Sequence, residues 1–268
     1  MLSFTGSTST GRKILASASS AIKKTTLELG GKSAALVLDD MDLAVAAKTL
    51  AAAGARNAGQ VCAGLTRIIV TKNRHDELVE AVAHHFSELR VGDPFDDASQ
   101  MGPLAARRQR DLVEHYIERG VAEGADLATG GRRPRHLDHG WYVEPTVFGN
   151  VSPSSTIAQE EIFGPVLSVL SAEDDDAAVA IANDTIYGLN ASVFTQDQDR
   201  AFAIARRLRS GTVGHNAFRA DFGIAFGGFK QSGVGREGGR EGLLPYFEVK
   251  TVILDGEPTG YDSSAAPQ

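Results

Sequence analysis

Cys62, the single cysteine among 268 residues, is the first candidate for chemistry. It lies in the run NAGQVCAG at 57–64, among small residues, and an apolar segment at 68–70 follows it. A cysteine that only fills space usually sits among large apolar side chains, whereas glycines let a backbone approach a ligand closely. Cys62 is therefore a candidate nucleophile, although a half-buried structural thiol is the more common explanation for a lone cysteine.

Glu28 is a second candidate, because it ends an apolar strand expected at 24–29 and precedes Gly30 and Gly31. The carboxyl ends of strands in α/β proteins face the crevice where ligands bind. The glycines leave the carboxylate room to act as a general base on water. A glutamate at a sheet edge, paired with a neighbouring lysine, explains the same pattern equally well.

Two further stretches could hold a ligand. Gly6 and Ser7 follow a strand and open a helix, where free backbone N–H groups favour an anion such as a pyrophosphate. Glu161 and Phe163, in the run EEIFGP at 160–165, could hydrogen-bond sugar hydroxyls and pack on a flat ring. An ordinary capped helix and a turn terminus are the respective alternatives.

Other patterns carry less weight. The run GVGREG at 233–238 matches the dinucleotide fingerprint in letters, but it opens no βαβ unit, so we interpret its glycines as a tight surface turn. The seven histidines have no zinc-ligand spacing, so we predict no metal site.

Strands and helices are expected to alternate along the chain, which predicts an α/β fold with a largely parallel sheet. Strands are expected at 2–4, 24–29, 34–38, 66–71, 126–129, 142–148, 166–171, 191–195 and 212–214. Helices are expected at 12–21, 43–56, 74–89, 105–123, 173–183 and 197–209.

Composition narrows the class of protein. Apolar residues make up 42% of the chain and charged residues 23%, which is ordinary for a soluble globular protein. The net charge of −7 argues against a nucleic-acid partner. No apolar run is long enough to span a bilayer, no secretory signal opens the chain, and one cysteine forms no internal disulfide. These features predict a cytoplasmic location and no membrane partner.

In combination, the motifs resemble those of the aldehyde dehydrogenase superfamily. The run LELGGKS at 27–33 resembles its glutamate signature, and GQVC at 59–62 resembles its cysteine signature, in the family's order and spacing. The runs at 4–8, 160–165 and 226–233 also look like family motifs, and the resemblance extends to about residue 255.

The resemblance implies a role for each site residue in the oxidation of a small-molecule aldehyde to an acid with NAD or NADP. Cys62 is implied as the nucleophile that forms a thiohemiacetal and then a thioester, and Glu28 as the base that activates the hydrolytic water. Asn216 matches a catalytic asparagine near the cysteine, and Phe226 matches an aromatic that lines the aldehyde pocket. The implied cofactor contacts are Gly6, Ser7, Leu29, Gly30, Glu161 and Phe163.

The implied fold is an aldehyde dehydrogenase-like catalytic domain with the last piece of a Rossmann-like cofactor domain. Residues 1–33 end the cofactor domain, 34–240 form the catalytic domain, 241–255 form an oligomerisation strand region, and 256–268 form a disordered tail. The segment 248–254 resembles a strand that pairs across subunits, which implies a homo-oligomer, dimer or tetramer, for a full-length protein.

Family members carry roughly another domain before the first residue of this chain. No residue here matches the asparagine that completes their oxyanion hole or the lysine that grips the adenine ribose. We therefore expect a truncated chain that is the carboxy-terminal half of such an enzyme and binds NAD weakly by itself. Two alternatives stay open: a non-catalytic remnant that associates with intact subunits, and a cofactor-independent thiol esterase using Cys62 and Glu28.

Overall fold

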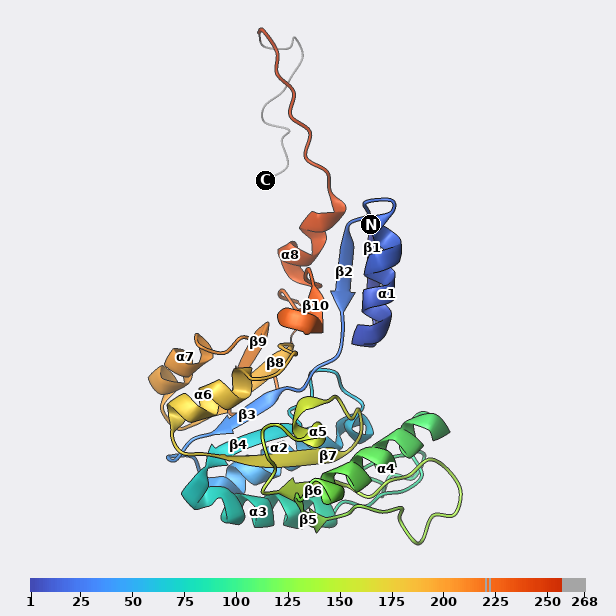
Figure 1. Ribbon diagram of the computed structural model, residues 1–268, viewed down its shortest axis with the longest axis vertical. Coiled ribbons are helices and arrows are strands. Elements are labelled where there is room, and N and C mark those ends of the chain that lie inside the picture. The colour runs from blue at the N-terminus through green and yellow to red at the C-terminus, as the bar shows by residue number, and fades with distance from the viewer. Residues whose placement is uncertain (220, 222, 257–268) are drawn as a thin grey trace.

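The computed structural model describes residues 1–219, 221 and 223–256, and its strands form two sheets (Figure 1). The larger sheet has seven strands in the order β5-β6-β7-β4-β3-β8-β9, and all neighbouring pairs are parallel except β5 with β6. Its strands are β3 Ala34–Val37, β4 Arg67–Thr71, β5 Asp126–Thr129, β6 Thr146–Gly149, β7 Val166–Ala172, β8 Asn190–Phe194 and β9 Thr212–His215. The predicted α/β fold with a largely parallel sheet is confirmed.

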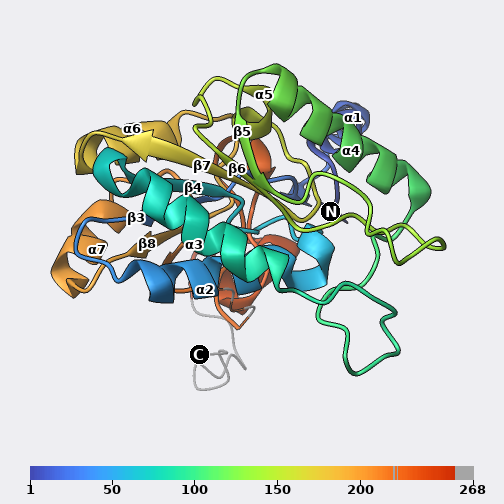
Figure 2. The same ribbon diagram turned by 90° about the horizontal axis from the view of Figure 1, so that it is seen from below.

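Helices cover both faces of the larger sheet. Apart from Arg67 and Asn190 at their first positions, the central strands β3, β4 and β8 consist of apolar or small residues, as expected for strands buried on both faces. Figure 2 shows α2 and α3 on one face and α6 on the other. The helices are α1 Thr8–Ser19, α2 Leu43–Ala55, α3 His75–Ser87, α4 Arg107–Ala122, α5 Thr156–Gln159, α6 Asp175–Asn183, α7 Gln198–Ala205 and α8 Gly239–Leu243. Short 3₁₀ turns are η1 Arg56–Gly59, η2 Lys72–Arg74, η3 Lys230–Ser232 and η4 Leu244–Tyr246.

The smaller sheet contains β1 Leu2–Thr5 and β2 Thr25–Glu28, which are parallel, and β10 Gly233–Val234, which pairs antiparallel with β2. The surface turn predicted at 233–238 is therefore wrong for its first two residues, because they fill the free edge of β2. The antiparallel pairing agrees with rejecting this run as a dinucleotide fingerprint. Residues 233 and 234 therefore belong to the smaller sheet, although we expected all of 34–240 to belong to the catalytic domain.

Several element boundaries differ from expectation for local reasons. Helix α1 begins at Thr8, four residues earlier than expected, because Ser7 caps it: Ser7 Oγ accepts from the Thr10 amide at 3.2 Å. The strand expected at 142–148 begins only at Thr146, directly after Pro145, which has no N–H for a ladder. Helices α5 and α8 were not predicted, because helices of four and five residues give no readable periodicity.

The segment 248–254 forms no strand with any residue that the structure describes. It leads away from the two sheets (Figure 1), and Val249 and Ile253 are at least 90% exposed. Pairing of this segment across subunits stays a prediction. The disordered tail predicted at 256–268 lies, from residue 257 on, outside the described residues.

Candidate active site

Cys62 follows a tight turn at the end of α2. Asp42 starts this helix by accepting from the amides of Ala44 and Val45, and the helix ends at Ala55. Asn57, Ala58 and Gly59 then all have positive φ values, of 52°, 53° and 73°. Three consecutive left-handed residues, two of them not glycine, are a strained conformation of the kind found at functional sites.

Side-chain hydrogen bonds stabilise this turn. Asn57 Nδ2 donates to the Gln60 carbonyl and Gln60 Nε2 donates to the Asn57 carbonyl, each at 3.0 Å. Gln60 Oε1 also accepts from the Ala105 amide at 3.0 Å, which ties the turn to the start of the α4 region. These hydrogen bonds therefore hold the backbone directly before Cys62, whose side chain is half-buried.

Close backbone contacts bring the sequence motifs together. A Cβ placed on Gly31 would lie 2.3 Å from the carbonyl oxygen of Cys62, and one on Gly59 would lie 2.1 Å from the carbonyl of Gly164. Any side chain at either position would push the two segments apart. The glutamate motif, the cysteine motif and the EEIFGP motif therefore meet at positions where only glycine fits.

One cavity of about 580 Å³ collects most of the residues singled out from sequence. Seven of them line it: Gly6, Ser7, Leu29, Gly30, Cys62, Glu161 and Phe163. Its remaining walls are Thr5, Gln60, Val61, Arg108, Gln109 and Leu112. The structure thus gathers, around the thiol, side chains that are far apart in the chain.

The wall formed by α4 was missed by sequence reasoning, since α4 has the pattern of an ordinary amphipathic helix. Gln109 Nε2 donates to the carbonyls of Ile162 and Phe163, at 3.0 and 2.9 Å. These bonds support Phe163 in a left-handed conformation, with φ of 55°. The side chain of Phe163 is 36% exposed and lines the cavity.

Glu161 is held against the glutamate motif. Its Oε1 accepts from the Gly31 amide at 3.0 Å, and its Oε2 lies where a Cβ of Gly30 would be. Burial raises the pKa of Glu161, while the Gly31 hydrogen bond and the charge of Lys32 act in the opposite direction.

Lys32 is a buried ammonium beside this carboxylate. Only 2% of it is exposed, and Nζ has no hydrogen-bond partner among the residues that the structure describes. Burial, followed by the charge of Arg67, lowers its pKa to about 7, against the attraction of Glu161 and Glu160.

Glu28 is also buried, at 3% exposure, and neither carboxylate oxygen accepts a hydrogen bond from a described residue. Oε1 lies against Gly227, where a Cβ would be 2.5 Å away. Burial, then the charge of Glu237, raises the pKa of Glu28 to about 8, and Arg236 opposes this. A carboxyl group that titrates near neutral pH suits a general base.

Opposing effects act on the pKa of the Cys62 thiol. Burial raises its pKa first, followed by the charge of Glu161 and, more weakly, that of Glu28. Hydrogen bonds from the backbone N–H groups of Ala63 and Cys62 act in the opposite direction. The N–H donors that a reactive thiol needs are present, but a base must still remove its proton.

Glu28, Phe226 and Asn216 are not among the residues that line the cavity. Phe226 is 6% exposed and packs with Ala63 and Leu189 in a cluster that Cys62 also contacts. Asn216 uses both ends of its amide on the backbone of Thr195, with Oδ1 accepting at 2.9 Å and Nδ2 donating at 2.8 Å. The structure therefore commits the Asn216 amide to the β8–β9 connection and leaves neither end directed at a substrate.

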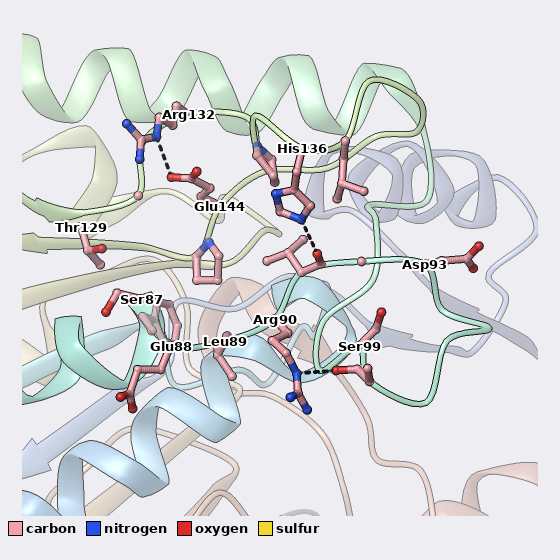
Figure 3. A pocket seen from close by; sticks show the side chains of 18 of the residues that line it. Ser87, Glu88, Leu89, Arg90, Asp93, Ser99, Thr129, Arg132, His136 and Glu144 are labelled. Carbon is pink, nitrogen blue, oxygen red and sulfur yellow. Dashed lines mark hydrogen bonds and ion pairs between the residues drawn. The ribbon is translucent and has the colours of Figure 1, made fainter.

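A second cavity, of about 730 Å³, lies elsewhere on the larger sheet (Figure 3). It contains none of the residues expected in the site. Several of its polar side chains are already paired, such as Arg132 with Glu144 at 2.9 Å, and His136 Nε2 with the Val91 carbonyl at 3.1 Å. Volume alone therefore does not identify the functional site.

The fold and the site together have the features of α/β enzymes that act through a thiol. These features are the largely parallel sheet, the cysteine after a strained turn, the adjoining cavity and the buried carboxylate of raised pKa. Comparison with known proteins gives the family. The sequence profile of the aldehyde dehydrogenase family matches residues 1–252. The chain belongs to this family.

Individual relatives agree with the family match. Over 255 residues the chain is 47% identical to geranial dehydrogenase of Castellaniella defragrans, and over 257 residues it is 46% identical to betaine aldehyde dehydrogenase of Brucella melitensis. Each alignment covers 95% of this chain and 53% of the relative. A crystal structure of Mycobacterium tuberculosis aldehyde dehydrogenase complexed with NAD+ has a TM-score of 0.93 and 47% identity, over 97% of this chain and 54% of that one.

The chain thus spans about half the length of the curated relatives it matches. Within its described part, none of the helices has the length and apolar character needed to cross a membrane.

Proposed function

We propose that this chain carries the catalytic thiol and the water-activating base of an NAD(P)-dependent aldehyde dehydrogenase. The observation that carries the proposal is the single cavity that joins Cys62 to Glu161, Phe163, Gly6 and Ser7. The names of the relatives, which are geranial and betaine aldehyde dehydrogenases, support the reaction class.

The proposed chemistry begins at the Cys62 sulfur. A base removes the thiol proton, and Sγ attacks the aldehyde carbon to form a thiohemiacetal whose oxygen is stabilised by backbone N–H groups. Loss of a hydride from that carbon leaves a thioester on Cys62. Glu28 takes a proton from water, and the resulting hydroxide attacks the thioester carbon. The carboxylic acid leaves, and its departure restores the thiolate of Cys62.

The cavity residues fit a nicotinamide dinucleotide. When bound, this cofactor supplies the acceptor for the hydride. Ser7 and Gly6 stand at the amino terminus of α1, which favours a pyrophosphate. Glu161, fixed by the Gly31 amide, can accept hydrogen bonds from ribose hydroxyls, and the half-exposed ring of Phe163 can pack on a flat base. Leu29 and Gly30 complete this wall. The NAD+ complex of the tuberculosis enzyme supports NAD, and NADP is the alternative.

The proposed substrate is a small-molecule aldehyde that approaches Cys62 beside Phe226. Asn216 is proposed to hold together the carboxyl ends of β8 and β9. For the whole protein we propose a cytoplasmic homo-oligomer that pairs through 248–254. We propose that residues 1–33 form the end of its cofactor domain and that 34–240 form its catalytic domain. Strand β10 is the part of 34–240 that pairs in the smaller sheet.

The test is the appearance of reduced nicotinamide when the native protein receives geranial or betaine aldehyde with NAD or with NADP. Activity that depends on an aldehyde and is lost in Cys62→Ala supports the proposal. Ester hydrolysis without any dehydrogenase activity would favour the thiol esterase, and the absence of both activities would favour a non-catalytic chain.

A further inference from the structure

Asn190, the first residue of β8, is buried behind the turn that carries Cys62. Only 2% of Asn190 is exposed, and its Nδ2 donates to the carbonyl oxygen of Ala63 at 3.1 Å. A buried amide costs free energy unless both of its ends are hydrogen-bonded. The donor end of this amide is thus committed to the residue directly after the candidate nucleophile.

By the register of β3 and β8, Ser33 is the position across from Asn190 on the neighbouring strand. Neither Oδ1 of Asn190 nor Oγ of Ser33 has a hydrogen-bond partner among the residues that the structure describes, and both residues are buried. Strands β3 and β8 are parallel with Ala34 opposite Ala191, so Ser33 and Asn190 stand opposite each other on one face. The structure has no direct hydrogen bond between these two atoms, so we infer that the hydroxyl, which rotates, donates to Oδ1 through one bridging water.

The Ala63 carbonyl determines which way this amide points. If the amide were turned over, Oδ1 would face the carbonyl oxygen of Ala63, and two acceptors would meet without a proton between them. In the observed orientation the outward Oδ1 needs a donor, and the Ser33 hydroxyl is the neighbouring group that can supply one. The two side chains together therefore favour a single orientation.

We propose that Asn190, oriented by Ser33, is a positioning residue for Cys62: it holds the Ala63 carbonyl so that the Ala63 backbone N–H stays directed at the thiol. That N–H is one of the two backbone donors that lower the pKa of Cys62 against the effect of burial. Ala63 is also packed against Leu189 and Phe226, so its remaining freedom is at the carbonyl that Asn190 binds. The inference rests on the proposed role of Cys62 as nucleophile.

The test measures the rate of Cys62 alkylation by iodoacetamide as a function of pH, which is specific because the chain has one cysteine. Asn190→Leu removes the donor at similar volume. We expect alkylation about fivefold slower at neutral pH, with its pH midpoint moved upward, as for the loss of one buried hydrogen bond. Ser33→Ala should move the midpoint in the same direction by less, and it serves if Asn190→Leu does not fold.

Ser192→Ala is the matched control. Ser192 lies two residues further along β8, is fully buried, and donates to the Ala217 carbonyl at 2.9 Å. The Ser192→Ala variant should be less stable than the parent, but the pH midpoint of Cys62 alkylation should stay where it is. A wild-type pH profile in Asn190→Leu, or an equal shift in Ser192→Ala, overturns the proposal. Alkylation needs neither aldehyde nor cofactor, so failure to oxidise aldehydes would count against the proposed function alone.

Discussion

The α-carbon of Gly31 lies against the backbone carbonyl of Cys62, so closely that a Cβ on Gly31 would meet the carbonyl oxygen at 2.3 Å. The amide of the same Gly31 donates to Glu161 at 3.0 Å. One glycine therefore connects the segment that follows Glu28 with both the backbone of Cys62 and the carboxylate that we assign to the cofactor.

Gly31→Ala should displace the Cys62 turn. We expect a loss of about 1–3 kcal/mol in the free energy of unfolding, as for overpacking at a closed site, and slower alkylation of Cys62. Urea unfolding and iodoacetamide kinetics measure the two effects. Gly102→Ala is the control, because a Cβ there would meet only Pro94, at an ordinary 3.6 Å. Equal behaviour of the two variants would contradict the close contact at Gly31.

Glu28→Gln should stall the release of an acyl group from Cys62. The amide cannot take a proton from water, so an acyl-enzyme formed with a nitrophenyl ester should accumulate where the parent protein turns it over. Intact-mass measurement over time follows the adduct. Glu118→Gln, on the exposed face of α4, should behave like the parent. Unchanged adduct decay in Glu28→Gln would remove Glu28 from its assigned role.

Lys32 should make stability depend on pH. Its folded pKa of about 7 lies below the ordinary 10.5, so between these values the folded chain binds fewer protons than the unfolded one. The free energy of unfolding therefore rises with pH across this window, and the gain is lost as pH falls back to about 7. Lys32→Met should abolish the rise and be more stable at neutral pH, because a buried charge without a hydrogen-bond partner is gone.

The raised pKa of Glu28 has the opposite effect on how stability depends on pH. Its pKa is raised from 4.5 to about 8, so stability falls as pH rises between those values. Urea unfolding at several pH values separates the two groups. In Lys32→Met, the decrease in the free energy of unfolding that Glu28 causes should remain. If the free energy of unfolding of Lys32→Met still rose with pH above about 7, a group other than Lys32 would cause the rise.

Asn216→Ala should affect stability more than chemistry. Removing the amide leaves the Thr195 N–H without its side-chain partner, which costs about 1–3 kcal/mol, while the Thr195 carbonyl keeps His215 Nε2 at 3.0 Å. The rate of Cys62 acylation by a nitrophenyl ester should stay within about twofold of the parent rate. A large loss of acylation in a protein that is still folded would restore Asn216 to a direct catalytic role.

The sequence predicted the fold well where periodicity is long, as in α2 and α3, and where strands are rich in β-branched and other apolar residues, as in β4 and β7. It also indicated seven of the residues that line the cavity, because the glycines and the reactive side chains occur in the same motifs. Gln109 and Asn190 could not be found in this way. Each acts through a backbone carbonyl more than fifty residues away, and no local pattern encodes such a contact.

The central claim is that Cys62 is the nucleophile of the site, and covalent trapping tests it most directly. The chain is mixed with p-nitrophenyl acetate, and the acetylated residue is located by peptide mass spectrometry in Glu28→Gln, where the adduct should persist, and in Glu28→Gln with Cys62→Ala. We predict one acetyl group on Cys62 in the first protein and none at position 62 in the second. Acetylation elsewhere with Cys62 unmodified, or equal ester hydrolysis by Cys62→Ala, would contradict it.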